Sequence, residues 1–315
     1  MLKFFSGKNV PVLILCFIYL AIGASQPLRG DFANYAYMAI NGFMSQFDNQ
    51  PFFSIYMEFF RHISPTIFLF FVSSSLPLLA LFLTKFLRKG HRYFIISAEL
   101  LYAAVLLFLV MPSASFYFLF RQNLASLIYL ILGKVNLPLA MIVSSGFHLS
   151  IILPVLIAYA LSIFFHKFPL KGLIIVFLPA MLFMISYSLS YLSTSILQIF
   201  SESGNNIFIT YSSIYSGYSD TYSEMWRLYT LSFLSVLVFA FLERRRNINF
   251  PLSLCFYFLI GATMSALLFN WSQPIAYRYL QFIRLPSIII LANALSLLKF
   301  TSNISYASLA RSSKY

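Results

Sequence analysis

Residues 116–150, FYFLFRQNLASLIYLILGKVNLPLAMIVSSGFHLS, decide the fold class of this chain. Two apolar segments flank a single lysine, Lys134, with Arg121 thirteen residues before it and His148 fourteen residues after it. If the segments are helices that meet at a turn near Lys134, each polar residue lies about 20 Å from that turn, at about 1.5 Å per residue. That depth is inside a hydrocarbon layer about 30 Å thick, where a charge is costly and usually functional.

The composition excludes a soluble protein. Of 315 residues, 60% are hydrophobic and only 9% are charged, whereas soluble domains carry about 25% charged residues. We therefore predict an all-α, polytopic integral membrane protein that forms a single membrane domain over residues 1–315. The net charge of +13 comes from basic residues that separate the apolar runs, which is typical of membrane topology. The lipid bilayer is the expected partner, and nucleic acid is not.

The order of apolar runs and basic loops predicts about ten transmembrane helices, with both termini in the cytoplasm. The expected spans are approximately 10–24, 65–84, 93–111, 113–134, 137–148, 150–165, 172–194, 226–242, 251–269 and 279–298. Two larger loops, about 26–64 and 195–225, are expected on the outer face. The run 10–24 ends in small residues, so a cleaved signal peptide is the alternative to a retained first helix. Residues 137–165 form either one helix broken at His148 or two spans.

Every basic residue that this topology places away from the cytoplasm is an arginine. These residues are Arg29, Arg61, Arg121, Arg227, Arg278 and Arg284. Arginine grips phosphate through two parallel donors, so the outer face is expected to hold a phosphate or pyrophosphate. Near the C-terminus, Tyr277, Gln281 and Arg284 follow at i, i+4 and i+7 and share one helix face. We expect this polar stripe to face the helices that carry Arg121 and His148.

Five short motifs follow one another along the chain. They are RGDFANY at 29–35, QPFF at 50–53, RQNLA at 121–125, FHLS at 147–150 and YRY at 277–279. In this order they resemble the EpsG-like family of bacterial Wzy-type polysaccharide polymerases, which make exopolysaccharide, capsule or O-antigen chains. The first four are similar to that family's Gly-(x)-Asp-x-x-x-Tyr, Glu-Pro-x-(Phe/Tyr), Arg-Gln-x-(Leu/Ile)-Ala and Phe-His-x-Ser elements. Gln50 replaces the acid of the second element.

The resemblance implies glycosyl transfer at the outer face of the bacterial inner membrane. The growing chain on undecaprenyl pyrophosphate would pass to the next lipid-linked repeat unit. A sugar hydroxyl attacks the anomeric carbon and lipid pyrophosphate leaves, which needs cations at the leaving group and a base at the hydroxyl. The implied partners are the undecaprenyl-pyrophosphate-linked oligosaccharide and a chain-length regulator.

The candidate site residues combine the resemblance with expected depth. The catalytic candidates are Arg121, His148 and Asp31. The candidates for pyrophosphate binding are Arg121, Arg278 and Arg284. The candidates for sugar binding are Gln122, Tyr35, Asp220, Glu224 and Gln281. Cys16 and Cys255 lie in apolar runs, and no Cys/His cluster has metal-ligand spacing, so neither a metal nor a cofactor is expected.

Each candidate has an ordinary structural alternative. Arg121 could extend to the outer interface without binding substrate, and His148 could join two helices by a hydrogen bond. Asp31 could be a helix N-cap. Glu99 stands alone in the third span, near its cytoplasmic end, where pairing or extension of the side chain to the membrane surface is favoured over a transport role. Two other functions also fit the pattern: a transporter or flippase of lipid-linked sugars, and an O-antigen ligase-like glycosyltransferase.

Overall fold

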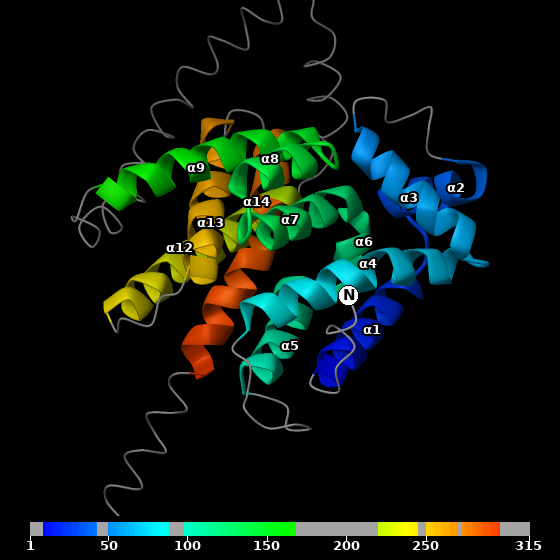
Figure 1. The fold of residues 1–315 in the computed structure, drawn as a ribbon, viewed down its shortest axis with the longest axis horizontal. Helices are drawn as coiled ribbons and strands as arrows, with labels where there is room; N and C mark the ends of the chain where they lie inside the picture. The colour runs from blue at the N-terminus through cyan, green and yellow to red at the C-terminus, as the bar shows by residue number, and fades with distance from the viewer. Residues whose placement is uncertain are drawn as a thin grey trace, which may run out of the picture. The chain divides into compact units, whose positions relative to one another are not determined.

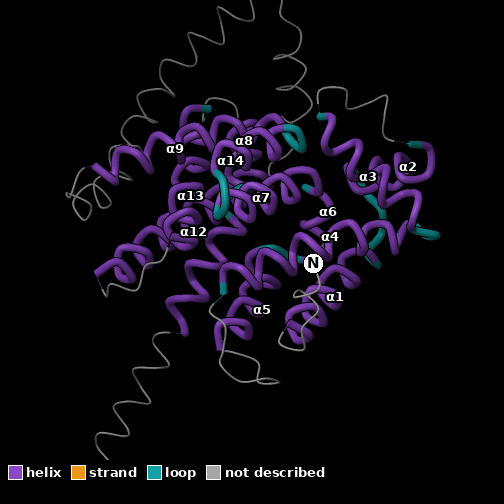
Figure 2. The backbone as a smooth tube through the Cα atoms, viewed as in Figure 1, coloured by secondary structure: helices purple, strands orange, loops and turns teal. Residues whose placement is uncertain are grey.

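The fold is all-helical, as the sequence predicts. The computed structural model describes the following residues: 9–42, 50–87, 98–167, 220–244, 250–269 and 273–296. These residues form helices joined by turns and short loops, and no strand occurs among them (Figure 2). The expected span 172–194 and most of the expected loop 195–225 lie outside the described residues.

The chain divides into two compact units. Unit 1 contains Met1–Leu149, Asn249–Leu252 and Ile288–Tyr315, and unit 2 contains Ser150–Ile248 and Ser253–Ser287. The helices of unit 1 in Figure 1 are α1 (Val10–Ala24), α2 (Asp31–Asn41), α3 (Pro51–Ile63), α4 (Ile67–Phe86), α5 (Ala98–Val110), α6 (Ser113–Phe118), α7 (Phe120–Gly133) and α8 (Leu137–Ser145). After a 3₁₀ turn at Leu149–Ile151 come α9 (Ile152–Lys167), α12 (Asp220–Arg244), α13 (Phe250–Leu268) and α14 (Gln273–Gln281).

Within the described ranges, four helices are long and apolar enough to cross a membrane. They are Ile67–Phe86, Ser223–Arg244, Phe250–Leu268 and Ile275–Ser296. They coincide with the spans expected at 65–84, 226–242, 251–269 and 279–298, which confirms that these segments are apolar helices of membrane-crossing length. Shorter apolar helices occur at Val10–Ala24, Leu100–Val110 and Leu149–Ile163.

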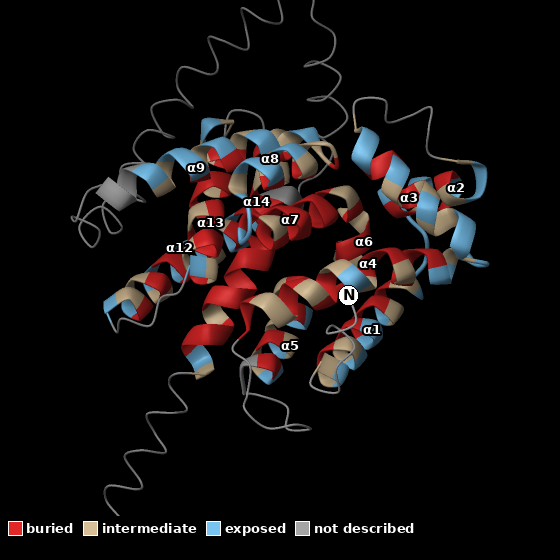
Figure 3. Cartoon of the chain, viewed as in Figure 1, coloured by how far each residue is buried: buried red, intermediate tan, exposed pale blue. Residues whose placement is uncertain are grey.

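In unit 1, α4 packs against both α1 and α7, and α7 packs against α8. Helix α7 is buried along almost its whole length (Figure 3). Two lysines join the C-terminal ends of α4 and α7. The Lys134 ammonium donates to the Lys85 carbonyl at 3.1 Å, and the Lys85 ammonium donates to the Ile131 carbonyl at 3.5 Å. Because carbonyls in the last turn of a helix lack intrahelical donors, each lysine completes the other's helix.

The expected fourth span is not one continuous helix. It breaks at Leu119 into α6 and α7. The Asn123 side chain explains the break, because its Nδ2 donates to the Phe116 carbonyl at 3.0 Å. That bond satisfies a carbonyl in the last turn of α6 and competes with continuation of the helix. As a result Arg121 is the second residue of a new helix and not a residue of a helix interior.

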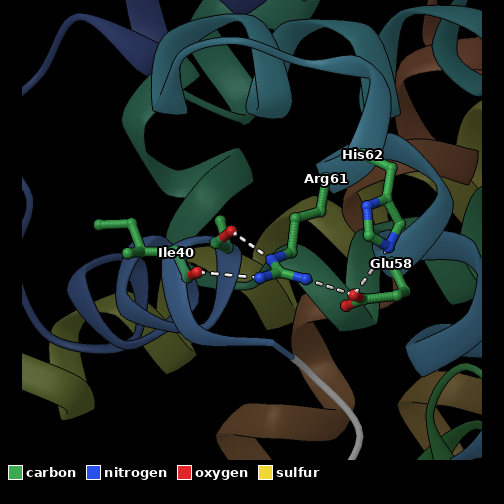
Figure 4. A network of polar contacts seen from close by, with 5 residues as sticks. Ile40, Glu58, Arg61 and His62 are labelled. Carbon is green, nitrogen blue, oxygen red and sulfur yellow. Dashed lines mark hydrogen bonds and ion pairs between the residues drawn. The ribbon is translucent and has the colours of Figure 1, made fainter.

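The segment expected as the first outer loop contains two helices, α2 and α3. Arg61 of α3 ties them together by donating to the carbonyls of Ala39 and Ile40, at 3.0 and 3.1 Å, in the last turn of α2 (Figure 4). Its Nη1 also donates to Glu58 at 2.5 Å, and His62 Nε2 lies 3.3 Å from the same carboxylate oxygen. Arg61 therefore has a structural role as a helix cap.

In unit 2, α9 and α13 approach closely at a glycine. A Cβ atom added to Gly261 would lie 2.2 Å from the Pro154 carbonyl oxygen, so only glycine permits this crossing. Helix α13 also packs on α12 through stacked rings of Phe239 and Phe256, 3.9 Å apart, and Ser232 forms a 2.7 Å hydrogen bond to Thr263 in the same pair.

Candidate functional site

Arg121 lies at the start of α7 and contacts residues of α2 and of the beginning of α3. Its Nε donates to the Tyr35 hydroxyl of α2 at 2.8 Å, and its Nη1 donates to the Gln50 side-chain oxygen at 3.2 Å. Its guanidinium carbon lies 5.8 Å from the centre of the Tyr35 ring and 5.9 Å from the centre of the Phe53 ring. These two hydrogen-bond acceptors are neutral side-chain groups that orient the guanidinium.

Phe53 connects Arg121 to the end of α8. Its backbone N–H donates to the Gly146 carbonyl at 3.1 Å, and its ring contacts the Phe147 ring at 6.3 Å between centres. The beginning of α7 and the end of α8 therefore meet at one aromatic residue. Four of the five sequence motifs contribute to this cluster: Tyr35, Gln50 with Phe53, Arg121, and Phe147.

His148 lies at a break in helical structure, which both predictions for residues 137–165 allow. Helix α8 ends at Ser145, and a 3₁₀ turn begins at Leu149, so His148 belongs to no helix. Its backbone N–H donates to the Ser144 carbonyl at 3.0 Å, which closes the end of α8. The histidine directly follows Phe147, whose ring contacts Phe53.

Tyr56 anchors α3 to α4. Its hydroxyl donates to the Ser74 carbonyl at 2.6 Å, and its ring contacts Phe147 at 5.4 Å. Burial raises the pKa of Tyr56 because the charged phenolate would lose its hydration. The hydroxyl therefore stays protonated and keeps this hydrogen bond.

Asp31 is not the N-cap of α2, so that alternative is wrong. Gly30 is the capping residue, with a φ of 53° that favours glycine, and Asp31 is the first helical residue. The Asp31 side chain is exposed in the first turn, where a carboxylate interacts favourably with the helix dipole. Tyr35 follows it by four residues, so both lie on one face of α2. Gln122 is buried in α7 next to Arg121.

A second polar cluster lies within unit 2. Arg284 is buried, with 4% of its side chain exposed, and its Nη2 donates to Glu224 Oε1 of α12 at 2.5 Å. The other oxygen of Glu224 lies 3.7 Å from Arg227 Nη1. Gln281, one turn before Arg284, is 2% exposed. The sequence placed Arg284 and Glu224 in separate candidate groups, and the structure pairs them.

The remaining candidates lie apart from these contacts or outside the described side chains. Arg278 is half-buried on α14. Asp220 is the first residue of α12, and Glu99 lies in α5, but the side chains of both are outside the described residues. Within the described ranges, no three His, Cys, Asp or Glu residues gather closely enough to hold a metal ion.

Comparison with known protein families, characterised proteins and solved structures finds no match for this chain. The site is therefore defined by its own contacts. Sequence reasoning missed Phe53 as the residue that joins Arg121 to the end of α8. The QPFF motif contained the signal, because an aromatic residue two positions after proline, at the start of an amphipathic run, is well placed to face a neighbouring helix.

Proposed function

We propose that this protein polymerises lipid-linked oligosaccharide repeat units into a surface polysaccharide. The observation that carries the proposal is the convergence on Arg121 of Tyr35, Gln50 and Phe53, residues from motifs that resemble those of Wzy-type polymerases. These segments are up to 86 residues apart in sequence. A shared site gives a physical reason for their occurrence together.

In this proposal Arg121 holds the pyrophosphate of the undecaprenyl-linked donor. Its guanidinium is a planar fork that suits phosphate oxygens, and the positive end of the helix dipole at the start of α7 adds to the attraction. Stabilising the negative charge that develops on the leaving pyrophosphate accelerates transfer to a sugar hydroxyl. Arg278 is a second candidate for this role. Glu224 already compensates the charge of Arg284, so we do not assign the pyrophosphate to that residue.

The base that accepts the proton of the sugar hydroxyl is assigned to His148 or Asp31. His148 lies beside Phe147 at the end of α8, and Asp31 lies one turn from Tyr35 on α2. Neither group requires a metal to act as a base. Separate replacement of each by alanine distinguishes them, because only loss of the true base leaves binding of the lipid-linked substrate intact while stopping transfer.

The proposal includes a topology of about ten spans in the bacterial inner membrane, with both termini in the cytoplasm. The reciprocal bonds between Lys85 and Lys134 support it, because they bring the ends of α4 and α7 to one level. If both ends lie at the cytoplasmic face, Arg121 lies about 20 Å above that face, near the outer one. The substrate would then be used after its transfer to the outer leaflet.

Substitution of Arg121 tests the proposal. In cells that make the polysaccharide, Arg121→Ala should leave a single repeat unit on the lipid carrier, with transfer slowed about 100-fold or more by loss of a charged donor. Arg121→Lys keeps the charge but loses the fork and should give short chains. Arg244→Ala, an exposed arginine at the end of α12, is the matched control. Normal chain length in Arg121→Ala at normal protein level would refute the assignment.

Reconstitution separates the polymerase from the alternative functions. Purified protein in vesicles should form polymer from lipid-linked repeat units without an ion gradient. Movement of the lipid-linked sugar across the bilayer without a new glycosidic bond would instead identify a transporter or flippase. Transfer of a finished chain to a different acceptor would identify a ligase. The short broken segments around His148 are the feature that a transporter shares.

A further inference from the structure

The helix Ile275–Ser296 contains a local break inside an otherwise buried stretch. The backbone N–H groups of Phe282 and Ile283 donate to the carbonyls three residues earlier, of Tyr279 and Leu280, at 3.1 and 3.2 Å. Such bonds belong to a tighter 3₁₀ turn. Pro286 explains it, because proline has no N–H for the Phe282 carbonyl and its ring crowds that carbonyl. Breaks of this kind in membrane helices often adjoin binding sites.

Polar atoms without partners flank this break. The side-chain oxygen and nitrogen of Gln281, the Nε of Arg284 and the hydroxyl of Ser287 are all buried, and none reaches hydrogen-bond geometry with a partner within the part of the chain that the structure describes. The Tyr277 hydroxyl, one turn before Gln281, interacts with its side chain without reaching that geometry. Gln281 and Arg284 are 2% and 4% exposed. Buried polar groups are normally satisfied, so a cluster of unsatisfied ones on successive turns indicates a place for a polar ligand.

The charge of the cluster limits what the ligand can be. The positive charge of Arg284 is paired with Glu224 at 2.5 Å, and Glu224 is also 3.7 Å from Arg227. A phosphate next to Arg284 would have to approach the Glu224 carboxylate as well, and like charges repel. The paired arginine still has an unused Nε donor. The cluster therefore favours a neutral ligand that both donates and accepts hydrogen bonds.

We propose that Gln281 and Arg284, flanking the break in this helix, bind a hydroxyl-rich neutral ligand, which is the chemistry of a sugar ring. The Gln281 amide offers one acceptor and two donors, which match adjacent hydroxyl groups. Arg284, held in place by Glu224, contributes its Nε donor. Glu224 is 31% exposed and Arg227 is 78% exposed, so the polar side of the cluster reaches solvent through α12. The identity of this sugar as part of the lipid-linked substrate rests on the proposed function, but the binding step does not.

The stability of the protein without ligand gives the first test. Replacing an unsatisfied buried polar group by an apolar group of similar shape relieves a desolvation cost. Gln281→Leu should therefore raise the thermal midpoint of the full chain in lipid nanodiscs. The matched control is Asn293→Leu on the same helix, because Asn293 is buried but its Nδ2 donates to the Ile289 carbonyl at 2.8 Å, so this change should lower the midpoint. A lower midpoint for Gln281→Leu would overturn the inference.

Ligand titration gives the second test. The probes are glucose, galactose, N-acetylglucosamine and N-acetylgalactosamine, with inorganic pyrophosphate as the anionic comparison. At least one sugar should raise the midpoint of the wild-type protein and of Asn293→Leu, with about tenfold or more loss of affinity in Gln281→Leu. Any effect of pyrophosphate should be equal in all three proteins. Failure of every sugar, an unchanged sugar response in Gln281→Leu, or a pyrophosphate response that depends on Gln281 would each overturn the inference.

Glycan chain length in cells decides where the sugar comes from. If it belongs to the lipid-linked substrate, Gln281→Leu shortens the polymer at normal protein level. Normal polymer in Gln281→Leu overturns that assignment and leaves the polymerase proposal intact, since the latter depends on Arg121. Normal polymer in Arg121→Ala defeats the polymerase assignment of Arg121 without affecting the sugar titration.

Discussion

The close contact between α9 and α13 predicts that one methyl group added at Gly261 destabilises the protein substantially. In Gly261→Ala the new Cβ would lie 2.2 Å from the Pro154 carbonyl oxygen and 3.1 Å from the Ala158 backbone nitrogen. Ordinary contact begins near 3.4 Å, so the two helices must separate by about 1 Å. Both neighbours are backbone atoms, which cannot rotate away. Because neighbouring contacts are lost along the crossing as the helices part, we expect Gly261→Ala to cost about 1–3 kcal/mol.

Gly146→Ala is the matched control, because its added Cβ would overlap a neighbouring atom as severely as the Cβ of Gly261→Ala does. Its Cβ would lie 2.1 Å from the ring of Phe52. That ring is 40% exposed and belongs to a side chain that can rotate outward. Gly146 also has ordinary helical dihedral angles, with φ −68° and ψ −13°, so alanine adds no backbone strain there. We expect a cost below about 1 kcal/mol, and Phe52→Ala in the same protein should remove most of it.

The assay is thermal unfolding of the two variants and the wild type in the same detergent or nanodisc. At about 2–4 °C per kcal/mol for chains of a few hundred residues, Gly261→Ala should lower the midpoint by several degrees, and Gly146→Ala by less. Equal midpoints for the two variants, or a larger loss in Gly146→Ala, would refute the reasoning that the identity of the clashing atoms decides the cost.

Two further predictions concern unit 1. Tyr35→Phe removes the hydroxyl that accepts a hydrogen bond from Arg121 at 2.8 Å but keeps the ring. Because hydrogen bonds to charged groups contribute about 1.5–3 kcal/mol, polymer formation in vesicles should fall about tenfold or more. An unchanged rate would show that this bond does not position the arginine. Arg61→Gln loses the charged hydrogen bonds to the end of α2, so the amide hydrogens of α2 should exchange faster, while the amount of polymer formed per amount of folded protein stays constant. Loss of polymer at a normal amount of folded protein would contradict a structural role for Arg61.

Helices set by local composition could be predicted from the sequence. The apolar run 10–24 forms α1 with the expected bounds, and Ile67–Phe86 and Phe250–Leu268 lie within a few residues of expected spans. The break at His148 was also foreseeable, because the apolar segments on either side are each too short to cross a bilayer. These features depend on the length of each apolar run, which can be judged from that segment of sequence without knowing its tertiary contacts.

Features that depend on distant side chains were not predictable in this way. The break at Leu119 needs the Asn123 side chain to reach a carbonyl seven residues earlier. The partner of Arg284 is Glu224, 60 residues away. Tyr277, Gln281 and Arg284 would share one face of a regular α-helix, yet a 3₁₀ turn lies between the last two. Pro286 was the available signal, since a proline four residues after Phe282 disrupts regular geometry.

In the Arg121 cluster, the sequence motifs contained the residues that meet but did not predict that they meet. Tyr35 and Gln50 were candidates or motif members, and each accepts a hydrogen bond from Arg121. The glutamine at position 50 replaces an acid of the family that the motifs resemble. In this chain Gln50 accepts a hydrogen bond from Arg121 through its neutral side-chain oxygen.

The crossed lysines have a consequence for synthesis of the protein. Lys85 reaches the Ile131 carbonyl and Lys134 reaches the Lys85 carbonyl, so neither helix end is complete while the other is absent. A ribosome makes Lys85 well before Lys134, and at about 5–20 residues per second several seconds separate them. During that interval the end of α4 must rely on water or lipid headgroups for its carbonyls. Once α7 has been made it replaces those partners, so the two helix ends are completed together and only after Lys134 has been synthesised.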